Sequence, residues 1–156
     1  MRHLQRVALI AAATLAAVPA TAETVYVQTG RLIDGVSNEV RTGQCVTIVD
    51  EHIKAVGLCG KAPDGATIVD WSAYTVLPGL IDLHTHLADL GQSADLAAPM
   101  KASPAETALV GARNARVTLD AGFTSVRDVG VYRGLVDVTL RNAIDRGDVP
   151  GPRMWV

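Results

Sequence analysis

The chain has 156 residues, of which 49% are apolar and 19% are charged, a globular balance with no sign of disorder. This length suits one domain of ordinary size and is small for an elaborate enzyme. The net charge of −2 and the lack of any Lys/Arg cluster argue against nucleic acid or an anionic membrane surface as a partner.

The N-terminus has the three parts of a secretory signal peptide. Two early arginines are followed by an Ala/Leu-rich apolar run over residues 7–18 and by the small residues Ala20-Thr-Ala22. An apolar run of about 12 residues is too short to be a permanent membrane span. We therefore expect a signal peptide over residues 1–22, cleavage near Ala22–Glu23, and a mature protein that is periplasmic or secreted.

The next segment, residues 23–75, alternates short β-prone runs with turns that contain Gly, Pro or Asp. This pattern predicts a small antiparallel sheet with one buried face. The expected strands cover residues 24–28, 45–49, 53–57 and 66–70.

Cys45 and Cys59 flank one of these turns, and export would bring them into an oxidising compartment where a disulfide can form. A two-residue turn at Asp50-Glu51 places the two cysteines on opposite faces of the hairpin. A turn centred on His52 places them directly opposite each other, within bridging range. The glutamate suits the positive φ of a tight turn poorly, so both registers stay open.

The chain changes character near Trp71–Tyr74, and from Val76 onward strands alternate with helices. This order predicts a parallel sheet, either a barrel or a doubly wound sheet. Ser103 and Glu106 form a capping box at the start of the first helix, and Gly122 can end it. The expected elements are a strand from Val76 to His86, a helix from Pro104 to about Ala121, a strand over 123–127, a helix over about 134–146, and a strand that begins at Arg153.

The first of these strands, Val76 to His86, ends in two histidines separated by one residue. Because side chains alternate along a strand, Asp82, His84 and His86 are expected on one side of it. Two neighbouring imidazoles at the end of an apolar strand are half of a metal site. A bare His-x-His is more often an ordinary pair of histidines, but the residues that flank this pair favour a metal site.

Those flanking residues resemble a known family. Leu77-Pro-Gly-Leu-Ile-Asp-Leu-His-Thr-His86 is similar to the first-strand signature of the amidohydrolase superfamily. Residues 121–130 and 146–153 resemble its imidazolonepropionase-like branch, which includes exported Xaa-Pro dipeptidases. The resemblance implies an α/β fold, a (β/α)8 barrel with a β-sandwich built from both chain ends. The chain then holds a sandwich segment over 23–75 and the first βαβαβ part of the barrel over 76–156.

The resemblance also implies a chemistry. His84 and His86 would hold one divalent metal ion, most in keeping with zinc, in a centre of one or two ions that activates water and polarises the scissile carbonyl. The implied reaction is hydrolysis of a C–N bond in an amide, a cyclic amide or an Xaa-Pro dipeptide, so the partner is a small-molecule or dipeptide substrate. Asp82, Arg127 and Asp128 are candidates for orienting a ligand, contacting substrate or pairing structurally.

The long connection over residues 87–102 is a candidate substrate loop, because such connections usually have about two to six residues. A plain surface excursion is an equally good interpretation of it.

The sequence departs from the family pattern at its end, because it stops inside the expected third strand. A lysine, two further histidines and an aspartate of the family site have no position in it, so no catalytic residue can be assigned. Three strands close no barrel, so we expect a fragment that is inactive alone. Two other interpretations stay open: a non-catalytic β-rich binding module or pseudoenzyme remnant, and a small metalloprotein whose metal shell is completed by oligomerisation. The sequence carries no marker of oligomeric state.

Overall fold

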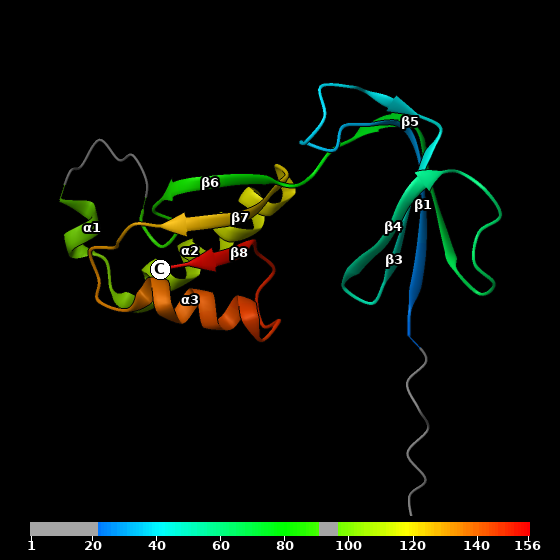
Figure 1. Ribbon diagram of the computed structural model, residues 1–156. Helices are drawn as coiled ribbons and strands as arrows, with labels where there is room; N and C mark the ends of the chain where they lie inside the picture. Colours follow the sequence, from blue (N-terminus) through cyan, green and yellow to red (C-terminus); the bar gives the residue numbers. More distant parts are fainter. Residues whose placement is uncertain (1–21, 91–96) are drawn as a thin grey trace, which may run out of the picture. The chain divides into compact units, whose positions relative to one another are not determined.

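The computed structural model describes residues 22–90 and 97–156 (Figure 1). They divide into two compact units, an N-terminal unit that ends at Val76 and a C-terminal unit that begins at Leu77 and includes Asp34–Ser37. The expected signal peptide, except its last residue, lies outside the described residues, as do residues 91–96 of the candidate substrate loop. In the described part of the chain, no helix is both long enough and apolar enough to cross a membrane.

Strand β1 (Thr24–Leu32) is central to the sheet of the N-terminal unit. It pairs antiparallel with β2 and β3 along one edge and parallel with β5 along the other. Its alternating Val and polar residues place Val27 opposite Val46 on one face, and both side chains are buried. The other strands of this sheet are β2 (Arg41–Thr42), β3 (Gln44–Val49), β4 (His52–Leu58) and β5 (Thr67–Val76).

The predicted antiparallel arrangement is correct for β1 to β4 and wrong for β5. Strand β4 already runs in the same direction as β1, and residues 59–66 return the chain to the starting end of β1. Strand β5 therefore enters beside β1 in the parallel sense. In the described residues this unit is one five-stranded sheet, a single layer where the family resemblance implies part of a sandwich.

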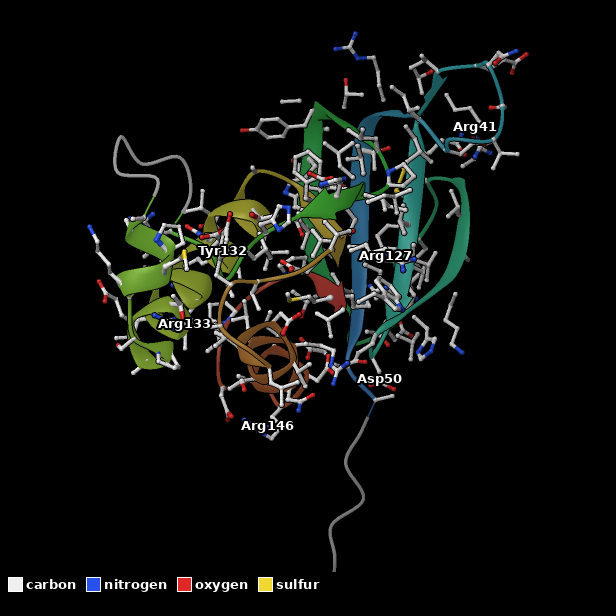
Figure 2. All side chains as sticks on the ribbon, turned by 90° about the vertical axis from the view of Figure 1, so that its left-hand side faces the viewer. Arg41, Asp50, Arg127, Tyr132, Arg133 and Arg146 are labelled. Carbon is white, nitrogen blue, oxygen red and sulfur yellow. A yellow bond between two sulfur atoms is a disulfide. The ribbon has the colours of Figure 1, made fainter. Side chains whose placement is uncertain are left out.

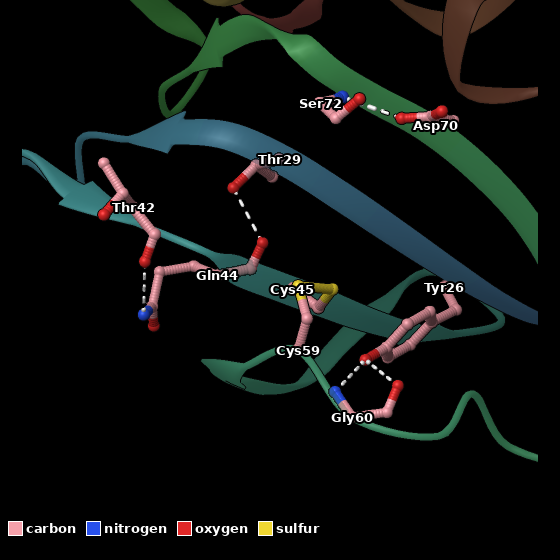
Figure 3. Close-up of a disulfide and its surroundings, with 9 residues drawn as sticks. All are labelled: Tyr26, Thr29, Thr42, Gln44, Cys45, Cys59, Gly60, Asp70 and Ser72. Atoms are coloured by element: carbon pink, nitrogen blue, oxygen red, sulfur yellow. Dashed lines mark hydrogen bonds between the residues drawn. A yellow bond between two sulfur atoms is a disulfide. The ribbon is translucent and has the colours of Figure 1, made fainter.

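Cys45 and Cys59 form a disulfide, with their Cα atoms 4.9 Å apart (Figure 3). The hairpin has the two-residue turn at Asp50-Glu51, with a φ of 53° at the aspartate. Neither expected register is correct, because Lys54 is an extra residue in β4 and shifts the pairing by one. Cys45 consequently faces Gly57, and Cys59, two residues further along, lies on the same face as Cys45.

The end of this hairpin is also tied to β1 by a side chain (Figure 3). The Tyr26 hydroxyl accepts a hydrogen bond from the Gly60 N–H at 3.0 Å and lies 3.3 Å from the Gly60 carbonyl oxygen, to which it can donate. The disulfide and the tyrosine therefore hold the segment after β4 at two consecutive residues, Cys59 and Gly60.

The C-terminal unit contains a parallel sheet in the order β6-β7-β8, with its helices between the strands in sequence. The predicted limits of its first long helix, α2, are confirmed: the Ser103 hydroxyl accepts the Glu106 N–H, and Gly122 follows the helix with a φ of 95°. The elements are β6 (Leu80–Thr85), α1 (Ala98–Lys101), α2 (Pro104–Asp120), β7 (Phe123–Asp128), α3 (Val136–Asp145) and β8 (Arg153–Trp155).

Helices α2 and α3 cover the same face of this sheet (Figure 1). Val126 in β7 and Met154 in β8 are paired in register, so their side chains lie on one face. Both are buried in one cluster with Ala115 of α2 and Leu140 of α3. The opposite face has no helix over it in the described residues, and Leu83 on that face is 71% exposed.

The close approach of β1 and β5 depends on Gly30. A Cβ atom at this position would lie 2.1 Å from the Ser72 carbonyl oxygen, at the point where the register of the two strands shifts. We expect Gly30→Ala to lower the free energy of unfolding by about 2–3 kcal/mol, because backbone has to move. Gly57→Ala, whose Cβ meets nothing within 4 Å, is the matched control and should change it by less than about 0.5 kcal/mol. Urea unfolding of the two variants measures both, and equal values would contradict the close approach.

The disulfide closes a hairpin whose cysteines are 14 residues apart. Replacing both cysteines by Ser should lower the free energy of unfolding of the N-terminal unit by about 2–3 kcal/mol. The fluorescence of Trp71, in a chain whose other tryptophan is replaced by Phe, reports this unit during urea unfolding. A thiol reductant should bring the parent chain to the stability of the double variant and leave that variant unchanged. A parent chain that is indifferent to reductant would contradict the prediction.

Candidate metal centre

The two histidines lie at the C-terminal end of β6, with His84 inside the strand and His86 directly after it. Both side chains are exposed, and their rings meet edge to face with centroids 5.5 Å apart. Two imidazoles that share one zinc ion through bonds of about 2.0–2.1 Å hold their ring centres roughly 5 Å apart. The separation of the two ring centres is close to that value.

The ring of His86 is oriented by a backbone contact. Its Nδ1 atom lies 2.7 Å from the Gly130 carbonyl oxygen. A carbonyl oxygen can only accept, so Nδ1 carries a proton, and in the neutral ring Nε2 then keeps its lone pair. Metal-binding histidines commonly have this arrangement, in which one ring nitrogen donates to the protein and the other faces the metal.

Asp82 does not share a side of β6 with the histidines, so that prediction is wrong. Asp82 pairs with Val126 and Thr85 pairs with Asp128, so β6 has two residues, Leu83 and His84, where β7 has one. This bulge puts Asp82 and Thr85 on one face and the two histidines that flank Thr85 on the other. The Asp82 carboxylate accepts the His84 N–H at 3.0 Å, so it supports the bulged backbone next to the first histidine.

Asp128, the last residue of β7, is 3% exposed and binds loop backbone. Its carboxylate oxygens accept the N–H groups of Leu87 at 2.6 Å and of Gly130 at 3.2 Å. Burial raises the pKa of this carboxyl above its usual value, against the lowering effect of the two N–H donors. The sequence analysis considered ligand orientation, substrate contact and structural pairing for Asp128. In the structure its carboxylate binds the neighbouring loops.

Arg127 lies on the face of the sheet that the helices leave open, with Ile81 and Leu83. It lines an open hollow of about 450 Å³ together with Ile81, Leu83 and Trp155. The sequence singled out this arginine without assigning it to a face. The structure separates it from Asp128, because neighbouring residues of a strand point to opposite faces.

Two loop contacts in the C-terminal unit have no counterpart in the sequence analysis. The Asn114 side chain of α2 donates to the carbonyl oxygens of Leu87 and Asp89. Arg133, after β7, donates to the carbonyl oxygens of Ala102 at 2.8 Å and of Met100 (Figure 2). An Asn inside a helix is a weak sign of such a contact, because it gains nothing locally there. The arginine sits in a loop without any distinguishing pattern.

A second open hollow, of about 390 Å³, lies beside His86. Its lining combines a carboxylate, Asp89, with an aromatic side chain, Tyr132, which is 66% exposed. A ligand held at His86 would therefore meet both a negative and an aromatic group. Neither residue was singled out from the sequence.

The two histidines suit a metal ion, but only as part of its set of ligands. Zinc sites in proteins usually have three or four protein ligands. In residues 22–90 and 97–156, no three His, Cys, Asp or Glu side chains gather closely enough to hold an ion. The part of the chain that the structure describes thus offers two candidate ligands, and the Nδ1 atom of His86 is already bound to backbone.

Curated relatives and solved structures resemble parts of this chain. The dihydroorotase of Geotalea daltonii is 39% identical over 67 residues, which are 43% of this chain and 16% of that enzyme. The dihydroorotase of Geobacter metallireducens is 37% identical over the same length. The crystal structure of a Xaa-Pro dipeptidase with bound methionine matches with a TM-score of 0.76 and 35% identity, and covers 85% of this chain.

A prolidase complexed with N-methylphosphonate-L-proline matches with a TM-score of 0.73 and 30% identity over 84% of this chain. The chain spans 32% and 31% of the lengths of these two structures, so each likeness concerns about a third of a longer protein. The family model for amidohydrolases matches residues 75–156, just over half of the 156 residues. On this match, the chain belongs to the amidohydrolase family.

Proposed function

We propose that this chain supplies the first metal ligands of an exported hydrolase that cleaves C–N bonds with a divalent metal ion, most fittingly zinc. One observation carries the proposal: two exposed imidazoles stand together at the C-terminal end of a parallel strand, and the Gly130 carbonyl leaves Nε2 of His86 available. Parallel α/β barrels carry their active sites at this end of their strands.

The residues have separate tasks in this proposal. His84 and His86 hold the metal, and the backbone around Gly130 fixes the second ring. When bound, a divalent metal polarises a carbonyl oxygen and makes water a better nucleophile. Tyr132 and Asp89 line the hollow beside His86 and would contact the part of the substrate nearest to it.

The preferred substrate class is a dipeptide of the Xaa-Pro type. The structural likeness to a Xaa-Pro dipeptidase extends over 85% of this chain and supports this choice. A cyclic amide is the second candidate, since the dihydroorotase relatives share 67 aligned residues with the chain.

Export rests on two features of different kinds. The first is the signal-peptide pattern of residues 1–22. The second is the disulfide between Cys45 and Cys59, which is in keeping with an oxidising compartment.

We further propose that these 156 residues alone do not catalyse. The described residues contain no group of three metal ligands, and three strands close no barrel. The DNA that follows the Val156 codon tests the proposed hydrolase. A continuing reading frame that encodes a lysine, two histidines and an aspartate at barrel spacing supports the proposal. An immediate stop codon contradicts hydrolysis by this gene product and favours a non-catalytic module.

The ligand assignment is tested by metal binding. Calorimetric titration of the chain with Zn²⁺ should detect one ion per chain, and His84→Ala or His86→Ala should weaken its binding at least about 100-fold, because a site with two imidazoles cannot lose one and stay tight. His52→Ala is the matched control, since this histidine begins β4 in the N-terminal unit and should leave the titration unchanged.

Three outcomes separate the interpretations. Binding that survives both substitutions contradicts the assignment of the ligands. Binding that appears only in oligomers, seen when sedimentation is measured with and without Zn²⁺, favours a site shared between copies of the chain. No binding to the parent chain at all favours the non-catalytic module.

A further inference from the structure

A buried carboxylate links the two loops that surround His86. Asp128 accepts the Leu87 N–H, which belongs to the peptide group directly after His86. The same carboxylate accepts the Gly130 N–H, two residues beyond itself. With 3% of its surface exposed, Asp128 makes both contacts away from solvent, where an unmade hydrogen bond is costly.

The second of these loops is the one that holds the imidazole. Gly130 donates its N–H to Asp128 and accepts the His86 Nδ1–H at its own carbonyl oxygen. Its φ of 134° lies in the region that only glycine adopts without strain. A further backbone bond, from the Val129 N–H to the Thr85 carbonyl oxygen at 3.0 Å, fixes the start of this loop against the end of β6.

We infer that Asp128 is a positioning residue for His86, which sets the tautomer and direction of that imidazole through the backbone of Gly130 and Leu87. The carboxylate holds the backbone on both sides of the contact: the peptide that follows the histidine and the residue whose carbonyl receives the ring proton. The effect of Asp128 on metal binding rests on the proposed function, whereas its effect on the tautomer of His86 does not.

The substitution that tests this keeps the shape and removes one acceptor. In Asp128→Asn the side-chain amide offers one oxygen and one N–H₂ group, so either Leu87 or Gly130 faces a donor in place of an acceptor. The loop then relaxes, and the Gly130 carbonyl no longer holds the Nδ1 proton. Gly130→Ala reaches the same contact by a different route, because Ala is strained at this φ.

The first measurement concerns the metal-free chain. Nitrogen-15 NMR of the histidine rings distinguishes the Nδ1–H tautomer from the Nε2–H tautomer, and His86→Ala identifies the signal. We expect the parent chain to show the Nδ1–H form, and Asp128→Asn and Gly130→Ala to show a mixture of the two forms. Two matched controls should keep the parent spectrum: Asp120→Asn, at an exposed carboxylate of α2, and Gly134→Ala, whose Cβ meets nothing within 4 Å.

The second measurement is Zn²⁺ affinity, by the same titration as for the histidine variants. Asp128→Asn and Gly130→Ala should weaken binding by about 10- to 100-fold, the usual effect of losing a partner of a metal-binding histidine. The two control variants should bind as the parent chain does.

The outcomes separate this inference from the proposed function. A parent chain with the Nε2–H tautomer at His86 overturns the inference, and this test needs no variant to fold. A parent Nδ1–H tautomer that is unchanged in Asp128→Asn also overturns it, even if Zn²⁺ binds. A tautomer that changes as expected in a chain without Zn²⁺ affinity supports the inference and contradicts the proposed function.

Discussion

The packing of two helices against one face of a three-stranded parallel sheet is the contact on which the C-terminal unit depends. Val126 is 1% exposed between Ala115 of α2 and its neighbours, and this burial is the main source of stabilisation that the unit has. Because both crossover helices cover this face, the other face is left open in the described residues. The two histidines flank Thr85 on that open side, next to Leu83, so the face that the helices bury and the face that carries the histidines are opposite faces of one sheet.

Local features of the fold could be predicted from the sequence, and long-range pairing could not. The start of α2 follows from the contact between Ser103 and Glu106, three residues apart, and its end follows from Gly122. The direction of β5 depends on the end of β1 to which residues 59–66 return the chain, and no pattern within residues 67–76 encodes that. Alternation of apolar residues indicates that one face of a strand is buried, but it does not identify the partner strand.

Two bulges of one residue each explain two wrong predictions, the register of the cysteine hairpin and the side of β6 on which Asp82 lies. Lys54 is an extra residue in β4, and it brings Cys59 to the face of Cys45. The bulge between Asp82 and Thr85 separates that aspartate from the histidines. In both strands a one-residue shift exchanges the two faces for every residue that follows. The second bulge had a sign in the sequence, because aspartate is unfavourable inside strands and tends to bind nearby backbone N–H groups, as Asp82 does.

The contacts that hold the surroundings of the histidines are made to backbone atoms. Asp128, Asn114 and Arg133 all bind peptide N–H or carbonyl groups of the loops after β6 and β7. Such bonds fix the path of a loop without depending on which side chains the loop carries. The exposed side chains that line the hollow beside His86, such as Tyr132, can therefore differ between related proteins while the loops keep their positions. A scaffold with this division lets the side chains at the hollow change and keeps the imidazoles in place.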